Sequence, residues 1–251
     1  MILFAFFSAA SIAGVNIALG IASIFVLWGA YKKEIKWRGL DKSIVLACLL
    51  FLLTVLSSGI GAQQPWVAVE RALNYFFRML PFFFVPLVCK EPKQLWMLLG
   101  AGAFSLFVAD IYALWQGLHG NLRAPAFHSH PMMLAGFLVQ WIPILTLTVA
   151  VNWGMQLPLK NSWRWGLGFL WLLSLAALVV NGTRGAWLAV VFLLVVLGAT
   201  LLRKNKLMLA AGVVVIALLI GAAGQHSGLQ ERVATLGDAS FQSNSERMLM
   251  W

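Results

Sequence analysis

The sequence predicts an all-α protein, a polytopic bundle of about eight or nine transmembrane helices. Hydrophobic residues make up 61% of the 251 residues and charged residues only 10%. Soluble domains are typically about 45–50% apolar and about 25% charged, so both values point to a membrane protein. Apolar runs of roughly 18 residues or more, long enough to cross a bilayer, also recur along the whole chain. The helical bundle is expected over residues 1–224, followed by a polar, non-spanning segment over residues 225–251.

The spans follow one another in chain order after an ambiguous start. Residues 1–30 fit either one long helix or two short crossings broken near residues 14–16. Tryptophans near segment ends, such as Trp28 and Trp66, fit the aromatic belt of a membrane interface. The clear apolar segments are residues 43–62, 72–89, 95–117, 132–152, 165–180, 186–202 and 207–224.

The positions of the basic residues predict which loops face the cytoplasm. The net charge is +10, but no basic face suits a nucleic-acid duplex, so no nucleic-acid partner is expected. One set of alternate loops carries Lys32, Lys33, Lys36, Arg38, Lys42, Lys90, Lys93, Lys160, Arg164, Arg203, Lys204 and Lys206. The other set carries Arg71, Arg123, Arg184, Arg232 and Arg247. The positive-inside rule makes the first set cytoplasmic, so each outer arginine needs a local reason to be there.

Arg184 is the leading candidate for a functional residue. It lies in the sequence Asn181-Gly182-Thr183-Arg184-Gly185, a tight turn between two apolar spans. Glycines let the backbone turn sharply and approach a ligand closely. The alternative is an arginine whose side chain extends to the lipid headgroups.

A second candidate region is the outer loop over residues 122–131, which carries Arg123, His128 and His130 just before an apolar span. Together with the helix N-terminus that follows, these groups suit an anionic headgroup. The alternative is an ordinary solvated loop. Two histidines at i and i+2 also occur in metal sites, but no carboxylate or third ligand lies nearby, so neither a metal nor a cofactor is expected.

Other polar residues leave the function more open. Arg78 and Asp110 both fall inside predicted spans, where they either pair structurally or line a substrate path. Cys48 and Cys89 lie in apolar runs and are expected to pack as small hydrophobic residues. Arginines on the outer side predict an anion-binding cavity for an anionic lipid or a lipid-linked substrate, because guanidinium groups hold phosphates by paired hydrogen bonds.

The segment NGTRGAWLA, residues 181–189, resembles the O-antigen ligase and polymerase superfamily, whose members carry a Ser/Thr-Arg-Gly/Ala turn that opens an apolar helix. The stretch from Arg123 to Pro131 is similar to the outer loop of that family. Glu231-Arg232, followed by Glu246-Arg247-Met248, is similar to the start of its large periplasmic loop.

This resemblance implies a metal-independent, membrane-embedded glycosyltransferase of the GT-C type in the bacterial inner membrane, with its active face in the periplasm. The donor would be a glycan on undecaprenyl pyrophosphate, and a ligase would transfer it to lipid A–core. A polymerase or a protein O-oligosaccharyltransferase is the alternative. By the same resemblance, Arg184 and His130 are the catalytic candidates. Arg184, Arg123 and Arg247 are the candidates for binding pyrophosphate.

The chain departs from the family pattern in one respect. Family ligases carry a histidine late in the large loop, with further spans after it, whereas this sequence ends at Trp251 and His226 lies too early. The 251 residues alone are therefore expected to be inactive. Family topology also favours two spans before the first basic loop. A transporter or flippase for an anionic solute is the rival from another class, although no internal repeat supports it, and a structural subunit comes third.

Overall fold

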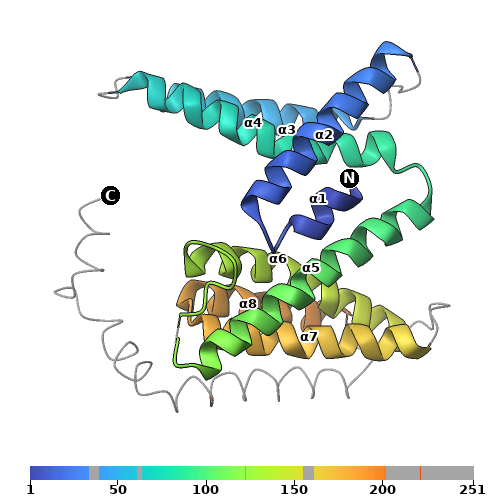
Figure 1. Cartoon of the computed structure of the whole chain (residues 1–251), viewed down its shortest axis with the longest axis vertical. Coiled ribbons are helices and arrows are strands. Elements are labelled where there is room, and N and C mark those ends of the chain that lie inside the picture. The colour runs from blue at the N-terminus through green and yellow to red at the C-terminus, as the bar shows by residue number, and fades with distance from the viewer. Residues whose placement is uncertain (34–39, 61–63, 122, 155–160, 202–220, 222–251) are drawn as a thin grey trace. The chain divides into compact units, whose positions relative to one another are not determined.

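The computed structural model describes residues 1–33, 40–60, 64–121, 123–154, 161–201 and 221, and all regular structure within these ranges is helical (Figure 1). This confirms the all-α prediction for the described residues. The helices are α1 (Ile2–Phe7), α2 (Ile12–Tyr31), α3 (Lys42–Ser57), α4 (Pro65–Val88), α5 (Pro92–Leu118), α6 (Pro131–Gly154), α7 (Asn161–Asn181) and α8 (Arg184–Leu201).

Three of the described helices are long and apolar enough to cross a membrane, namely Ile12–Tyr31, Pro92–Leu118 and the Pro131–Val149 part of α6. Shorter apolar helices cover Lys42–Ser57, Trp165–Asn181 and Gly185–Leu197. The predicted number of eight or nine spans is therefore not confirmed in the described part of the chain. The predicted span 207–224, apart from residue 221, and the segment 225–251 lie outside the described residues.

The N-terminal segment differs from both sequence-based alternatives. Its helical break lies at residues 8–11, where Ser11 caps α2 by accepting a hydrogen bond from the Gly14 N–H group (3.1 Å). Residues 14–16, the predicted break, lie inside α2. Helix α1 has only six residues, too few to cross a bilayer. One helix long enough to span a membrane, α2, is therefore present here.

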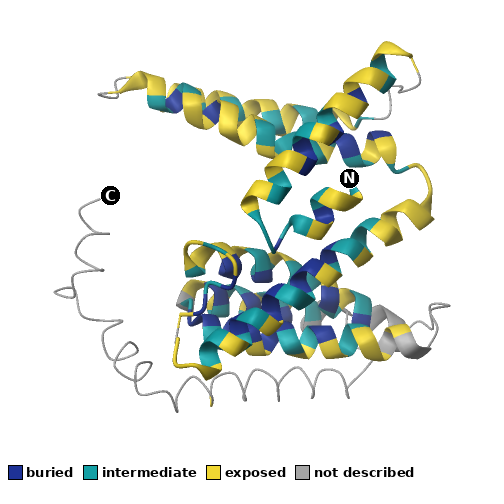
Figure 2. Cartoon of the chain, in the orientation of Figure 1, coloured by how far each residue is buried: buried dark blue, intermediate teal, exposed yellow. Residues whose placement is uncertain are grey.

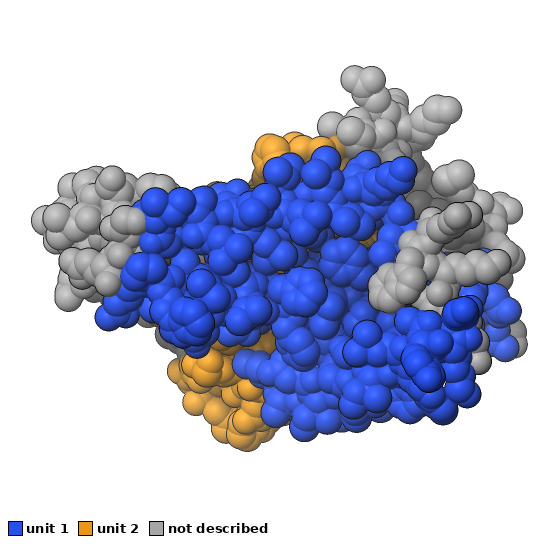
Figure 3. All heavy atoms as spheres, turned by 90° about the horizontal axis from the view of Figure 1, so that it is seen from above, with its two compact units in different colours: residues 1–109 blue, residues 110–251 orange. Residues whose placement is uncertain are grey.

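The chain divides into two compact units, residues 1–109 (unit 1) and 110–251 (unit 2), coloured separately in Figure 3. In unit 1, α2 and α3 each contact α4. Its core consists of Leu19, Ala22 and Val26 of α2 with Phe84 of α4. Helix α3 has no buried residue, so all of its residues are exposed or half-buried (Figure 2).

In unit 2, α6 packs against both α7 and α8. Two tryptophan side chains connect neighbouring helices. The Trp171 indole N–H of α7 donates to Thr146 Oγ1 of α6 (2.8 Å), and the Trp187 indole N–H of α8 donates to the Leu178 carbonyl of α7 (2.7 Å). Buried residues recur at helical spacing along α6. They are Leu134, Ala135, Leu138, Ile142, Leu145 and Val149.

Candidate functional site

Asn181, the last residue of α7, joins the two segments that the sequence singled out. Its side-chain Nδ2 donates hydrogen bonds to the backbone carbonyls of Ala124 and Pro131, both at 2.9 Å. Asn181 itself is fully buried. The loop over residues 119–130 and the turn over residues 181–184 therefore meet at one end of unit 2. We refer to this contact as the loop–turn junction.

A second amide fixes the conformation of the loop. Gln116 near the end of α5 accepts a hydrogen bond from the Ala126 N–H group (2.9 Å) and donates one to the Ala126 carbonyl (3.1 Å). Ala126 has a positive φ of 51°, a conformation that is uncommon for a residue other than glycine and needs such support. The ring of the next residue, Phe127, stacks on Tyr112 of α5 at a centroid distance of 4.6 Å. The backbone of the loop is thus held in one conformation on α5.

The turn between α7 and α8 is short because of its backbone conformation. Gly182 has a φ of 65°, in the left-handed region where glycine ends helices without strain. The Thr183 carbonyl then accepts the first hydrogen bonds of α8, from the Ala186 N–H (3.1 Å) and the Trp187 N–H (3.2 Å). The positive end of the α8 dipole consequently lies at the loop–turn junction, where it favours a negative charge.

The structure describes some of the predicted site residues fully, one only in its backbone, and one not at all. Arg184 is the first residue of α8, and its side chain lies outside the described atoms. Arg123 is exposed, and its backbone N–H donates to Asn121 Oδ1 (3.2 Å). Arg247 lies outside the described residues. The loop that carries Arg123 is thus joined to the turn at which Arg184 begins α8.

His130 is exposed, and its Nδ1 atom accepts a hydrogen bond from the Met132 N–H group at the start of α6 (3.2 Å). In a neutral imidazole, a nitrogen that accepts a hydrogen bond carries no proton, so the proton of His130 is on Nε2. That nitrogen is a hydrogen-bond donor in either protonation state. This arrangement suits contact with an anion better than proton abstraction.

Three buried polar atoms at the loop–turn junction have no hydrogen-bond partner within the described part of the chain: His128 Nε2, Asn181 Oδ1 and Thr183 Oγ1. Each of them can accept a hydrogen bond from a hydroxyl group or a water molecule. Burial lowers the pKa of His128 below its usual value, which favours the neutral imidazole. Sequence reasoning missed the role of Asn181, because an Asn-Gly pair at a helix end is equally typical of an ordinary C-terminal cap.

The two charged residues inside predicted spans have separate environments. Asp110 of α5 is fully buried, and its Oδ2 atom accepts a hydrogen bond from Ser174 Oγ of α7 (2.5 Å). Ser174 is thus the partner of one carboxyl oxygen, whereas the other oxygen, Oδ1, is buried without a hydrogen-bond partner among the described residues. Arg78 is an exposed residue of α4 in unit 1.

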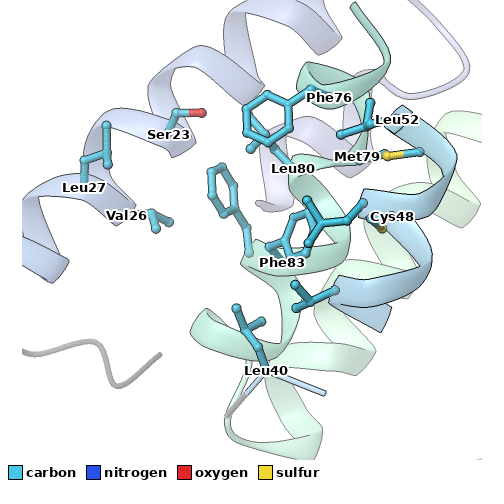
Figure 4. Close-up of a pocket in the computed structure, with 13 residues that line it drawn as sticks. Ser23, Val26, Leu27, Leu40, Cys48, Leu52, Phe76, Met79, Leu80 and Phe83 are labelled. Atoms are coloured by element: carbon cyan, nitrogen blue, oxygen red, sulfur yellow. The ribbon is translucent and has the colours of Figure 1, made fainter. Parts of the chain in front are cut away.

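An apolar cavity of about 480 Å³ lies in unit 1, among α2, α3 and α4 (Figure 4). No charged side chain lines it, so it does not suit a pyrophosphate. Among the described residues, no group of three or more His, Cys, Asp or Glu side chains is arranged so that it could hold a metal ion.

Comparison with known proteins gives a match for the part of the chain that contains the turn between α7 and α8. Residues 169–251 match the family model described as O-antigen ligase. No curated protein and no solved structure matches the chain. The matched region includes the segment 181–189 that carried the resemblance, which is thereby confirmed. Residues 169–251 of this chain are therefore similar to the O-antigen ligase family.

Proposed function

We propose that the chain belongs to a membrane glycosyltransferase of the GT-C type. It transfers a glycan from undecaprenyl pyrophosphate to lipid A–core at the periplasmic face of a bacterial inner membrane. The observation that carries this proposal is the pair of hydrogen bonds from Asn181, which join the loop to the turn that opens the family-matched helix α8. Residues 1–224 form the transmembrane bundle of this enzyme, and residues 225–251 begin its large periplasmic loop.

The chemistry of the transfer explains why arginines are needed at this junction. A hydroxyl group of the acceptor attacks the anomeric carbon of the donor sugar, and the bond from that carbon to the pyrophosphate oxygen breaks. The pyrophosphate leaves with an additional negative charge. Arg184 neutralises this charge through two parallel hydrogen bonds, and the N-terminus of α8, which begins at this residue, adds its dipole.

The loop supplies the remaining contacts to the pyrophosphate. Arg123 is exposed on the joined loop and provides a second guanidinium, with Arg247 as a third. His130 donates from Nε2, since its Nδ1 is occupied by the Met132 N–H group. The proton of the acceptor hydroxyl goes to a different group, which the family resemblance places late in the large loop.

A ligase is preferred to a polymerase or a protein O-oligosaccharyltransferase, which would use the same donor chemistry with another acceptor. The transporter alternative rests on Arg78 and Asp110, the ionisable residues that fall inside predicted spans. Ser174 satisfies only one carboxyl oxygen of Asp110. Glycan transfer is preferred because most of the unusual charge is predicted at one face of the bundle and not near the bilayer midplane.

The test is a lipopolysaccharide gel of the source cell with this gene disrupted. Cells are complemented with the full-length gene, either unchanged or carrying Arg184→Ala or Arg71→Ala. Arg71 is an exposed arginine of α4 in unit 1 and serves as the matched control. We expect loss of the O-antigen ladder on disruption, restoration by the unchanged gene and by Arg71→Ala, and no restoration by Arg184→Ala.

A single remaining rung would identify a polymerase instead of a ligase. An unchanged ladder in the disrupted strain would contradict both functions. Restoration by Arg184→Ala would remove this residue from the proposed site. Immunoblots of the protein in membranes confirm that the variants are inserted at equal levels.

A further inference from the structure

The cavity of unit 1 is formed by three helical stripes of mostly apolar side chains (Figure 4). On each helix the lining residues follow the i, i+3, i+4 pattern of a single helix face. Helix α2 contributes Ser23, Val26 and Leu27; α3 contributes Val45, Cys48, Leu49 and Leu52; α4 contributes Phe76, Met79, Leu80, Phe83 and Phe84; and Leu40 precedes α3. All thirteen belong to unit 1.

The cavity lies toward the lysine-bearing ends of these helices. Its residues reach Leu27 near the C-terminal end of α2 and Val45 near the N-terminal end of α3. Lys32 follows α2 directly, and Lys42 is the first residue of α3. In α4 the lining ends at Phe84, close to the C-terminus of the helix.

Lys32 is held at this end of α2 by a cation–π contact, with its Nζ 4.4 Å from the centroid of the Trp28 ring. Tryptophan at a helix end is typical of the membrane interface. The lysines of these loops form the set that the positive-inside rule assigns to the cytoplasm. An occupant of this cavity must therefore suit both its apolar lining and the lysines at the nearby helix ends.

The dimensions of the cavity match one lipid chain. At about 1.5 Å per residue, the lining stripe of α4 from Phe76 to Phe84 is about 12 Å long. One leaflet contributes roughly half of the ~30 Å hydrocarbon thickness, about 15 Å. An acyl chain of the cytoplasmic leaflet would therefore be long enough to follow most of the stripe with its headgroup at the level of the lysines.

We propose that this cavity binds one acyl chain of an acidic phospholipid from the cytoplasmic leaflet, with Lys32 and Lys42 beside its phosphate. The negative headgroup complements the lysines, and the chain fills space that water does not occupy favourably. The site is independent of the proposed glycan transfer. The undecaprenyl chain is a less suitable occupant, because its pyrophosphate belongs at the opposite, periplasmic face.

The experiment counts lipids on the purified full-length protein by native mass spectrometry after release from nanodiscs containing phosphatidylglycerol and phosphatidylcholine. The variant Leu49→Trp fills the cavity. Its control is Leu53→Trp on the same helix, because Leu53 is exposed to a similar degree as Leu49 but does not line the cavity. We expect one retained phosphatidylglycerol on the wild type and on Leu53→Trp, and none on Leu49→Trp.

The lysines are tested by the double variant Lys32→Gln/Lys42→Gln. At about 1 kcal/mol for each lysine near an acidic lipid surface, its affinity for phosphatidylglycerol should fall about tenfold to thirtyfold. Preference for phosphatidylcholine, equal retention by Leu49→Trp and Leu53→Trp, or retention of an isoprenoid phosphate in place of phospholipid would each overturn the proposal.

The two cysteines provide a test that needs no cavity-filling variant. Both are free thiols of intermediate exposure, and Cys48 lines the cavity whereas Cys89 does not. Labelling by methyl methanethiosulfonate is compared in the two lipids by peptide mass spectrometry. Phosphatidylglycerol should slow the labelling of Cys48 relative to Cys89, and an unchanged ratio would contradict the proposal.

Discussion

The loop–turn junction of unit 2 and the helix packing of unit 1 are stabilised by different interactions. At the junction, the amides of Asn181 and Gln116 hold backbone groups of the loop through directional hydrogen bonds. In unit 1, the core residues Leu19, Ala22 and Phe84 make apolar contacts. Hydrogen bonds fix positions but leave costly unpaired groups when one partner is lost, whereas apolar contacts tolerate small changes. The region held by directional hydrogen bonds is thus the one that carries the candidate site.

The largest effect is expected from Asn181→Leu. The change leaves the carbonyls of Ala124 and Pro131 without their donor, at a cost of about 2–6 kcal/mol when the penalties for two unpaired groups are added. Thermal unfolding in detergent should show a clear decrease in Tm. The matched change in unit 1 is Ser23→Ala, because the Ser23 hydroxyl only returns to the Leu19 carbonyl of its own helix, and its effect should stay within about 0.5 kcal/mol. Equal Tm values for the two variants would contradict the expected difference between the loop–turn junction and unit 1.

A smaller effect is expected from adding one methyl group to α5 at Gly117. A Cβ atom there would overlap the side chain of Val180 in α7, so Gly117→Ala should destabilise unit 2 by about 1–3 kcal/mol. Gly100 of the same helix has open space around it, and Gly100→Ala should stabilise by up to about 1 kcal/mol.

The double variant Gly117→Ala/Val180→Ala separates this clash from a general effect on α5. Removing the valine methyl groups should recover part of the lost Tm. If the double variant is less stable than the sum of both single changes, the close approach of α5 and α7 is not the cause.

The smallest effect is a pH dependence of the loop–turn junction. Burial depresses the pKa of His128 in the folded state, so its contribution to stability is present above the unfolded pKa of about 6.5 and is lost as the pH falls through the folded value. The Tm of the wild type should therefore decrease more on acidification from about pH 7 to about pH 5 than the Tm of His128→Gln. Parallel Tm profiles for the two proteins would show that His128 is not the group responsible.

Much of the fold follows from composition and hydropathy. The predicted segments 95–117 and 132–152 fall within α5 and α6, because long apolar runs in a bilayer satisfy their backbone hydrogen bonds only as helices. The break at residues 8–11 was not predicted, since it depends on Ser11, which caps α2 by accepting a hydrogen bond from the Gly14 N–H group, and on the close approach of Gly14 to the Phe7 ring. Local capping decides such boundaries, and hydropathy does not report it.

The segments that form the candidate site could be predicted from the sequence, but the contacts between them could not. Alternation of the spans placed Arg123 and Arg184 on the same side, and the junction joins their segments at one end of unit 2. The side chains that make the junction, Asn181 and Gln116, lie in sequences that look like ordinary helix ends. Hydrogen bonds between residues far apart in the chain leave no periodic signal, so they became visible only in the structure.

The most direct test of the central claim is a double-mutant cycle on the binding of undecaprenyl pyrophosphate to the full-length protein in nanodiscs. Arg123→Ala and Arg184→Ala should each weaken binding by about 1.5–3 kcal/mol, the range for hydrogen bonds to charged groups. If both arginines contact one pyrophosphate, the double variant should lose clearly less than the sum of the two. Strictly additive losses, or unchanged binding by Arg184→Ala, would contradict a shared site at the loop–turn junction.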